Sequence, residues 1–244
     1  MRIIGVVPAR SGSQGIPGKN ARVLAGYPLV SWSIIPALAA CDVVILTSND
    51  PEVLALGWVA ERLVVHRRSP MLATDRTPDL PVVLDAYQQI DQEPDDVIVL
   101  LRPTAPFRRE REITDCASLF RAVPEAHSVR SVLPSQVSAQ KMYRALGTEC
   151  VRARYEPVWL EPATEHHRAN HPRQALLDTY AACGFIDAVR ADILIGWNSL
   201  EGDRILGWPA PIGRASIEMD KEEDFFLAET IAHENQWTPG EVEG

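Results

Sequence analysis

Short, unbroken apolar runs alternate with segments of helical periodicity through the first half of this sequence. A strand with one face in water alternates apolar and polar residues, so an unbroken apolar run indicates a strand covered on both faces. Such runs occupy residues 3–8 (IIGVVP), 43–47 (VVILT) and 97–101 (VIVLL), and a shorter strand is predicted at residues 63–66. Helices are predicted between them at residues 29–40, 51–62 and 80–90.

Buried strands joined by helices predict an α/β fold, with a Rossmann-like, mostly parallel sheet and helices on both faces. We expect a single domain over residues 1–244, because a chain of this length with 46% hydrophobic residues can bury one large core. Residues 134–183 are irregular and are interpreted as an insertion. Regularity returns with a strand at 184–188 and a helix at 222–233. Such sheets bind ligands beyond the carboxyl ends of their strands, so the functional residues should lie in the loops there.

The charge balance narrows the classes of partner. A formal net charge of −9 argues against a nucleic-acid surface, which needs clustered Lys and Arg. No apolar run approaches the roughly 18 residues of a membrane span, and the N-terminal run is too short for a signal peptide, so we expect a cytoplasmic protein without membrane contact. The cysteines show neither metal-binding nor disulfide spacing and are expected to be free thiols: Cys41, Cys116, Cys150 and Cys183.

The segment PARSGSQGIPGKN, residues 8–20, follows the first strand directly. Its glycines, Gly12, Gly15 and Gly18, allow several backbone N–H groups to surround an oxyanion, and Arg10 and Lys19 supply positive charge. The segment therefore favours a triphosphate site. An ordinary flexible turn is the alternative, since Gly, Ser and Pro are common turn residues. It matches neither GxGxxG nor GxxxxGK[ST], which disfavours a dinucleotide fold and a Walker loop.

Two carboxylates alternate in the sequence Glu218-Met219-Asp220, which is predicted to be a strand end. Side chains two apart on a strand share a face, so both carboxylates can converge on one hard cation, for which Mg²⁺ is the expected ion. The alternative is a capping box, in which Asp220 pairs with Glu223 at the start of the next helix.

Several segments together resemble the CMP-N-acylneuraminate (sialic acid) cytidylyltransferase family, whose members activate acid sugars with CTP. In chain order they are PARSGSQGIPGKN with LAGYPLVSWSI, DVVILTSND, RRSPMLATDRTPDLPVVLDAY, LLRPTAPFR and IEMDKEEDFFLAE. The resemblance implies that CMP is transferred from CTP to an anionic acceptor with release of pyrophosphate. It also implies a homodimer formed through the insertion, for which the histidines His166, His167 and His171 fit an interface better than a zinc site.

The resemblance assigns a set of residues to the nucleotide and the chemistry. Arg10, Lys19 and Asp220 would carry the catalysis, and Asp220 and Glu218 would hold the metal. Glu218 departs from the Asp-x-Asp that is usual in the family. Asp79 could contact the cytidine or cap the following helix. The full nucleotide set is Arg10, Ser11, Gly12, Gly15, Lys19, Asn20, Arg68 and Asp79.

The acceptor side departs from these relatives. The family's Arg-Pro-Asn triplet is Ala181-Ala182-Cys183 here, the Lys of its SKG is Gln14, and the Gln of its LLQPTSP is Arg102. An arginine adds a planar cation suited to a carboxylate or phosphonate, so a small phosphonate such as phosphonoformate is an alternative to an acid sugar. Arg102 could instead form an internal salt bridge. The expected acceptor residues are Arg102, Lys141, Arg173 and Tyr180.

Two other classes share this fold. A non-catalytic nucleotide-binding protein would keep the loop at residues 8–20 but should lose the two metal carboxylates. A sugar-1-phosphate nucleotidylyltransferase would use the same loop with another base, and the TPDLPVVLDAY and RPTAP segments argue against it.

Overall fold

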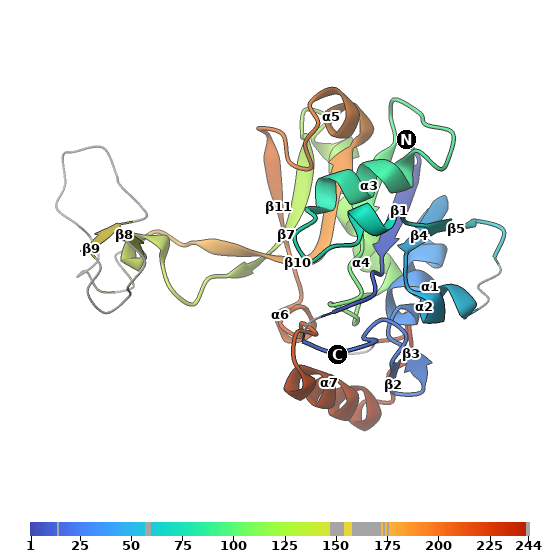
Figure 1. Ribbon diagram of the computed structural model, residues 1–244. Coiled ribbons are helices and arrows are strands. Elements are labelled where there is room, and N and C mark those ends of the chain that lie inside the picture. Colours follow the sequence, from blue (N-terminus) through green and yellow to red (C-terminus); the bar gives the residue numbers. More distant parts are fainter. Residues whose placement is uncertain are drawn as a thin grey trace. The chain divides into compact units, whose positions relative to one another are not determined.

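The computed structural model describes residues 1–13, 15–56, 60–146, 154–157, 172, 174 and 176–242. It divides the chain into two units, one formed by Met1–Ser131 with Cys183–Gly244 and the other by Val132–Ala182 (Figure 1). The predicted insertion at residues 134–183 overlaps the second unit. No helix in the described part of the chain has the length and apolar character needed to cross a membrane.

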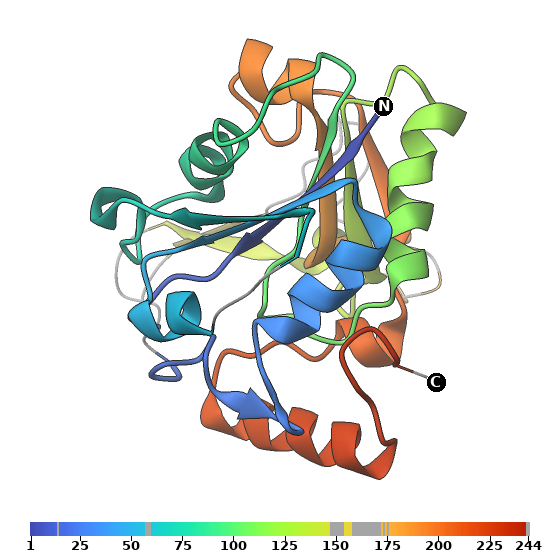
Figure 2. The same cartoon turned by 90° about the vertical axis from the view of Figure 1, so that its right-hand side faces the viewer.

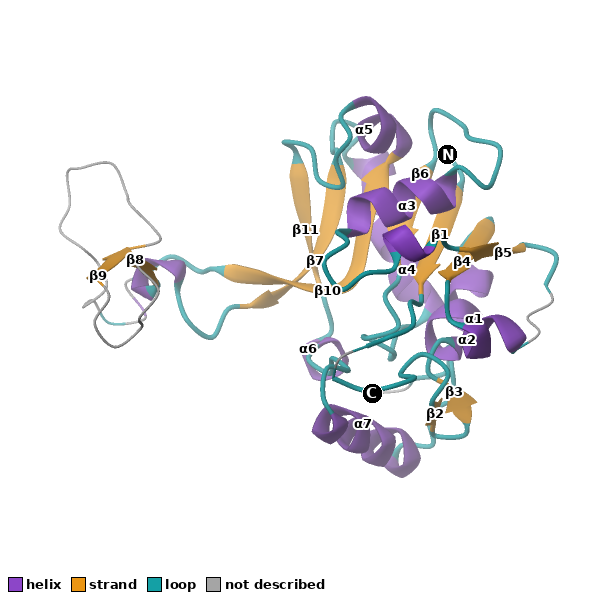
Figure 3. Ribbon diagram, viewed as in Figure 1, coloured by secondary structure: helices purple, strands orange, loops and turns teal. Residues whose placement is uncertain are grey.

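A seven-stranded sheet with the order β11-β7-β10-β6-β1-β4-β5 forms the centre of the first unit (Figure 3). Strand β1 pairs in parallel with β4 and β6, and β4 pairs in parallel with β5, whereas β10 runs antiparallel to β6. The predicted α/β class with a mostly parallel sheet is therefore confirmed. The strands are β1 Ile3–Pro8, β4 Val43–Ser48, β5 Leu63–Arg67, β6 Val97–Leu100, β7 Ser128–Pro134, β10 Tyr180–Arg190 and β11 Ile205–Pro209.

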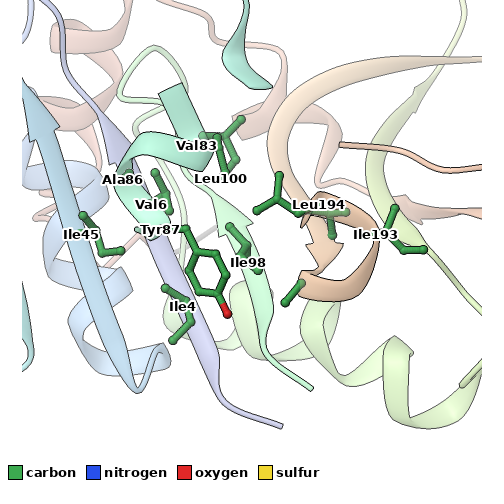
Figure 4. Close-up of a cluster of buried hydrophobic side chains, with 12 residues drawn as sticks. Ile4, Val6, Ile45, Val83, Ala86, Tyr87, Ile98, Leu100, Ile193 and Leu194 are labelled. Carbon is green, nitrogen blue, oxygen red and sulfur yellow. The ribbon is translucent and has the colours of Figure 1, made fainter. Parts of the chain in front are cut away.

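Helices cover both faces of the sheet, because the central strands are apolar on both sides (Figure 2). Helices α1 (Ser31–Ala40) and α4 (Glu110–Ala122) lie against one face. There Gly5 lets α1 approach closely, since a Cβ on Gly5 would lie 3.0 Å from the Cys41 Sγ. Helices α3 (Asp79–Tyr87) and α5 (Ala191–Gly196) cover the other face, where Figure 4 shows their apolar side chains against Ile4, Val6 and Ile98.

A second apolar cluster lies beneath the loop that follows β1. It is built on α7 (Glu222–Glu234) and on a two-stranded hairpin of β2 (Val23–Leu24) and β3 (Tyr27–Pro28). Trp32, Phe107 and Trp237 pack edge to face in it, with ring centroids 5.2 and 5.0 Å apart. The cluster also buries Ile16 and Met219, and it thereby anchors two segments that carry predicted site residues.

Some predicted elements have different limits. The first predicted helix, at 29–40, begins only at Ser31, because the preceding residues form the β2–β3 hairpin around Ala25 and Gly26, both at positive φ. The helix predicted at 51–62 is only α2 (Pro51–Ala55), and residues 60–62 are not helical. Sequence analysis had not predicted α4, β7, α5, β11 or the short helix α6 (Ile212–Ala215).

The second unit contains a short 3₁₀ helix and one strand pair in its described part. The 3₁₀ helix is Ala139–Lys141, and strands β8 (Tyr143–Leu146) and β9 (Arg154–Pro157) pair antiparallel. Within this unit Gln140 is buried and its side-chain oxygen accepts a hydrogen bond from the Leu177 N–H at 3.1 Å. The side chains of Met142, Tyr143, Leu177 and Tyr180 are exposed.

A buried carboxylate ties the amino ends of β1 and β6 to the carboxyl end of α3. Asp96 is fully buried and accepts hydrogen bonds from Arg2 at 2.8 and 2.9 Å and from the Tyr87 hydroxyl at 2.7 Å. Burial alone would raise the pKa of Asp96, but these bonds outweigh it and hold the pKa below its ordinary 3.8. The ionised network therefore stabilises the fold at pH values above that range.

We expect Tyr87→Phe to lower the free energy of unfolding by about 1–2 kcal/mol, because it removes one hydrogen bond to a buried charge. Thermal unfolding should show a fall in Tm of roughly 2–8 °C at neutral pH. The pKa of Asp96 is depressed, so the stabilisation is present above its ordinary value and is lost as the pH falls through the folded pKa. The difference from wild type should therefore shrink in acid. Tyr27→Phe, at a partly exposed ring, is the matched control, and an equal effect of both changes would contradict this assignment.

Candidate active site

A cavity of about 260 Å³ opens at the carboxyl ends of β1, β5 and β6. This volume lies near the lower end of the range for small-molecule sites, about 300–1,000 Å³. The cavity is lined by Pro8, Arg10, Ser13, Lys19, Asn20, Arg68, Leu72, Thr74, Thr77, Asp79, Val82, Arg102, Pro103, Thr104 and Asp220. The structure thus brings together Arg10, Lys19, Asn20, Arg68, Asp79, Arg102 and Asp220 from the set expected on sequence grounds.

Hydrogen bonds between neighbouring loops hold the loop after β1. The Asn49 side chain, which follows β4, accepts from the Ser11 N–H at 2.9 Å and donates to the Ser11 hydroxyl at 2.7 Å. Asn20 is buried and its amide nitrogen donates to the Arg10 carbonyl at 2.9 Å. Asn20 therefore joins the two ends of the loop, a structural role that the sequence did not show. Gly12 adopts a positive φ of 69°, which supports its predicted need for glycine geometry.

Lys19 reaches across the cavity floor to the segment that precedes α7. Its ammonium donates to the Met219 carbonyl at 2.5 Å and lies 4.0 Å from the Asp220 carboxylate. Burial lowers the pKa of Lys19, and the nearby Arg10 lowers it further, while Asp220 opposes the shift. The cation is thus held by a backbone oxygen and an acid on the same segment.

The segment Glu218–Asp220 is not a strand, so that prediction was wrong. Its backbone makes one hydrogen bond of the interstrand type, from the Met219 N–H to the Thr104 carbonyl at 2.8 Å. One such bond is too few to define a strand. Met219 is buried and its two acidic neighbours are exposed, so both carboxylates point away from the core. Helix α7 begins at Glu222, and the carboxylate of Asp224 in its first turn accepts from the N–H groups of Lys221 at 2.8 Å and of Asp220 at 3.1 Å, just before the helix. Asp220 is therefore not the helix cap.

The carboxylates of Glu218 and Asp220 suit a hard cation that also binds oxygen atoms of a ligand, because two protein ligands alone do not complete its coordination. Partial burial raises the pKa of Glu218, and repulsion from Asp220 raises it further. Among the described residues no group of three or more His, Cys, Asp or Glu side chains is placed to hold a metal. Two carboxylates with phosphate oxygens would complete a magnesium site.

Arg68 is a buried cation that faces the cavity. Its side chain donates to Thr47, to the carbonyl at 2.7 Å and to the hydroxyl at 3.3 Å, and its residue exposure is only 3%. Arg68 is therefore not a solvated surface arginine. Burial lowers the pKa of the guanidinium to about 10, an effect that Asp85 and Asp79 offset only in part. Its described partners are neutral, so an anionic ligand would stabilise it.

Arg102 lies in an internal clamp of two carboxylates. Its guanidinium donates to Asp79 through Nη2 at 2.7 Å and Nε at 3.2 Å, and to Asp187 on β10 through Nη1 at 2.7 Å. Burial lowers the pKa of Arg102, but the two acids outweigh it and raise the pKa. The protein itself therefore supplies the negative charge next to Arg102. This confirms the alternative prediction that Arg102 forms an internal salt bridge. Asp79 begins α3 but binds Arg102 rather than capping the helix.

Several residues that contact the lining of this cavity were not predicted from the sequence. Asp75 lies 2.6 Å from Arg10, and Asp187 contacts Arg102. No motif in the sequence marks Asp187 as a site residue. Arg108 is fully buried and donates to the carbonyls of Arg102 and Phe185 and, at 3.0 Å, to the Ser33 hydroxyl. Burial lowers its pKa to about 9. A charged residue inside the apolar PTAPFR segment was the available signal for Arg108.

Some expected acceptor residues belong to the other unit or fall outside the described residues. Lys141 and Tyr180 are both exposed and belong to the unit Val132–Ala182. Arg173, Gln14 and the histidines at 166, 167 and 171 lie outside the described residues. Their assignments stay predictions.

The first unit is an α/β fold with a cavity lined by arginine and lysine side chains at the carboxyl ends of its parallel strands. The profile of the family described as "Cytidylyltransferase" matches residues 4–154, more than half of the chain, so the chain belongs to this family. Its sequence is 36% identical over 139 residues to the CMP-N,N'-diacetyllegionaminic acid synthase of Legionella pneumophila, covering 55% of this chain and 59% of that protein. It is 32% identical over 144 residues to the N-acylneuraminate cytidylyltransferase of Escherichia coli, covering 57% of this chain and 33% of that protein.

These relatives confirm the resemblance to the sialic acid cytidylyltransferases. The matched region spans only about a third to three fifths of the relatives' own length.

Among solved structures, the CMP:2-keto-3-deoxy-manno-octonic acid synthetase complexed with CTP superposes with a TM-score of 0.63 at 17% identity. That match covers 96% of this chain and 99% of the other. The 4-diphosphocytidyl-2C-methyl-D-erythritol synthase of Anaerococcus prevotii gives 0.56 at 11% identity, over 95% and 98%. Both share the fold.

We expect Gly15→Ala to displace the loop at residues 10–20 from residues 218–220. A Cβ on Gly15 would lie 1.8 Å from the Asp220 carbonyl oxygen, so one of the two backbones must move. The change should cost roughly 1–3 kcal/mol and lower the Tm by roughly 2–10 °C. Hydrogen exchange should accelerate at the amides of the loop and stay unchanged in β1. Gly196→Ala, where nothing lies within 4 Å, is the control, and unchanged exchange in the Gly15 variant would contradict the packing argument.

Proposed function

We propose that this protein transfers CMP from CTP to an anionic small-molecule acceptor and releases pyrophosphate. The observation that carries the proposal is the convergence of Arg10, Lys19 and Arg68 on one cavity in a chain of the cytidylyltransferase family. Three cations from two loops, at the carboxyl ends of the parallel strands β1 and β5, suit the phosphates of a nucleotide.

In this proposal the cations bind and orient the triphosphate. Arg10 and Lys19 contact its phosphates from the loop after β1, and Arg68 contacts the nucleotide from the end of β5. An acceptor oxygen forms a bond to the α-phosphorus while the bond to the pyrophosphate oxygen breaks, and the pyrophosphate leaves as an anion. Lys19 stabilises the negative charge that develops on the leaving group, because it is held in place by the Met219 carbonyl.

Asp220, with Glu218, would hold Mg²⁺ at the edge of the same cavity. Asp220 lines the cavity and Glu218 is its exposed neighbour across Met219. Bound Mg²⁺ would neutralise charge on the phosphate oxygens and polarise the α-phosphorus.

The acceptor is proposed to be an acid sugar of the nonulosonic type or a small phosphonate. The names of the relatives favour an acid sugar, since they describe synthases of CMP-activated legionaminic and neuraminic acids. Arg102 favours a compact anion, because it offers a planar cation where these relatives are expected to carry glutamine. Its clamp by Asp79 and Asp187 weakens the attraction for any further anion, so Arg102 alone does not decide between the two classes. A homodimer through the insertion is part of the same proposal, supported by exposed apolar side chains such as Leu177 and Tyr180.

Release of pyrophosphate should require CTP together with an acceptor, and UTP, ATP and GTP should support it poorly. The assay offers each triphosphate at equal concentration against acid sugars of the nonulosonic type and against phosphonates such as phosphonoformate. Turnover with CTP and one acceptor class supports the proposal and assigns the acceptor. Equal rates with all four triphosphates would point to a nucleotidylyltransferase without preference for cytosine, and CTP binding without turnover would point to a non-catalytic nucleotide-binding protein.

We expect Asp220→Asn to lower kcat by on the order of 10²-fold or more at saturating Mg²⁺, because less of the triphosphate charge is neutralised. The dependence of the rate on Mg²⁺ concentration should also shift to higher concentrations. Glu223→Gln removes the same charge from an exposed position in the first turn of α7 and should leave both quantities near wild type. Near-normal turnover of Asp220→Asn would refute the metal assignment.

A further inference from the structure

Two acidic side chains on one short segment hold cations that line the cavity. Residues 73–79, here called the carboxylate strap, run from the end of a 3₁₀ helix (Pro70–Leu72) into the first turn of α3. The turn within the strap is closed by the Thr77 N–H to the Thr74 carbonyl at 3.2 Å and by a bond between the two threonine hydroxyls at 2.7 Å. Thr74 and Thr77 line the cavity, and Asp75 is presented between them.

The strap reaches loops that follow two different strands. Asp75 contacts the Arg10 Nη1 at 2.6 Å, and Asp79 contacts the Arg102 Nη2 at 2.7 Å. Arg10 follows β1 and Arg102 follows β6, so the strap supplies a negative charge to a cation from each loop.

The two pairs differ in how easily a ligand could replace the carboxylate. The Asp75 and Asp79 side chains are exposed to a similar extent, 39% and 42%, so the difference lies with their arginines. When a ligand replaces Asp79, Arg102 keeps a second carboxylate, Asp187, whose side chain is only 5% exposed. Among the described ion pairs Arg10 has Asp75 alone, so the contact between Arg10 and Asp75 is the one that a ligand anion gains most by replacing.

We propose that Asp75 is a built-in competitor for the phosphate site, a residue that sets the affinity for the triphosphate and promotes release of pyrophosphate. Its carboxylate holds Arg10 oriented while the cavity is empty and leaves when a phosphate group binds. Because breaking this pair subtracts from the binding free energy, the triphosphate and its product are bound less tightly than the cations alone would bind them. This inference rests on the proposed function only in taking the ligand to be a triphosphate.

The test measures binding of inorganic tripolyphosphate, and separately of CTP, by calorimetry at low ionic strength. Asp75→Asn should lower the dissociation constant of tripolyphosphate roughly two- to fivefold, the range for a partly exposed ion pair. Asp75→Glu keeps the charge and should return the constant toward the wild-type value. Glu222→Gln is the matched control, because it removes the same charge from another exposed arginine pair, Arg22–Glu222 at 2.6 Å, without touching Arg10.

Tighter binding in Asp75→Asn alone supports the inference. Equal or weaker binding would overturn it and make Asp75 a residue that positions Arg10 for the ligand. Equal tightening in Glu222→Gln would also overturn it, since the effect would then be one of net charge. Absence of tripolyphosphate binding in the wild-type protein rejects the inference. If tripolyphosphate binds with the expected shift but CTP yields no pyrophosphate with any acceptor, the proposed function fails while the role of Asp75 stands.

Discussion

The burial of Met219 is the interaction on which the geometry of the cavity depends. Its side chain packs in the cluster beneath the loop after β1, its N–H bonds to Thr104, and its carbonyl accepts from Lys19. Because Met219 faces inward, the carboxylates on either side of it face outward. One apolar side chain therefore fixes the position of a cation, of two acids and of the loop that packs against them through Gly15.

Most of the cations that line this cavity are paired with an acidic side chain of the protein. Arg10, Lys19 and Arg102 each have an acidic side chain within 4 Å, whereas Arg68 is held by Thr47. A cluster of unpaired cations would repel one another and weaken the fold, and a fully neutralised cluster would attract no ligand. Paired cations satisfy both requirements when a partner carboxylate can give way to a ligand, as proposed for Asp75 at Arg10.

The sequence predicted the features that are encoded by neighbouring residues, namely the parallel strands and the loop after the first strand. Unbroken apolar runs marked the parallel strands, and glycines with two cations after the first run marked the loop. The clamp of Arg102 depends on acids 23 and 85 residues away in the chain, and the burial of Arg68 depends on packing against β4. No spacing rule encodes such contacts. The Glu218–Asp220 segment shows the intermediate case, because alternation correctly separated the buried Met219 from its acidic neighbours although the segment is not a strand.

The clamp around Arg102 also constrains how this protein can evolve. Asp187 is buried between Arg102 and Arg130, whose Nε lies 3.3 Å from the second oxygen of that carboxylate. A single change of Arg102 to glutamine would leave Asp187 with one buried counter-ion fewer, and the fold would lose stability. Substitutions at positions 102 and 187 are therefore expected to be epistatic. A lineage that replaces Arg102 must pass through paired substitutions, or through a destabilised intermediate.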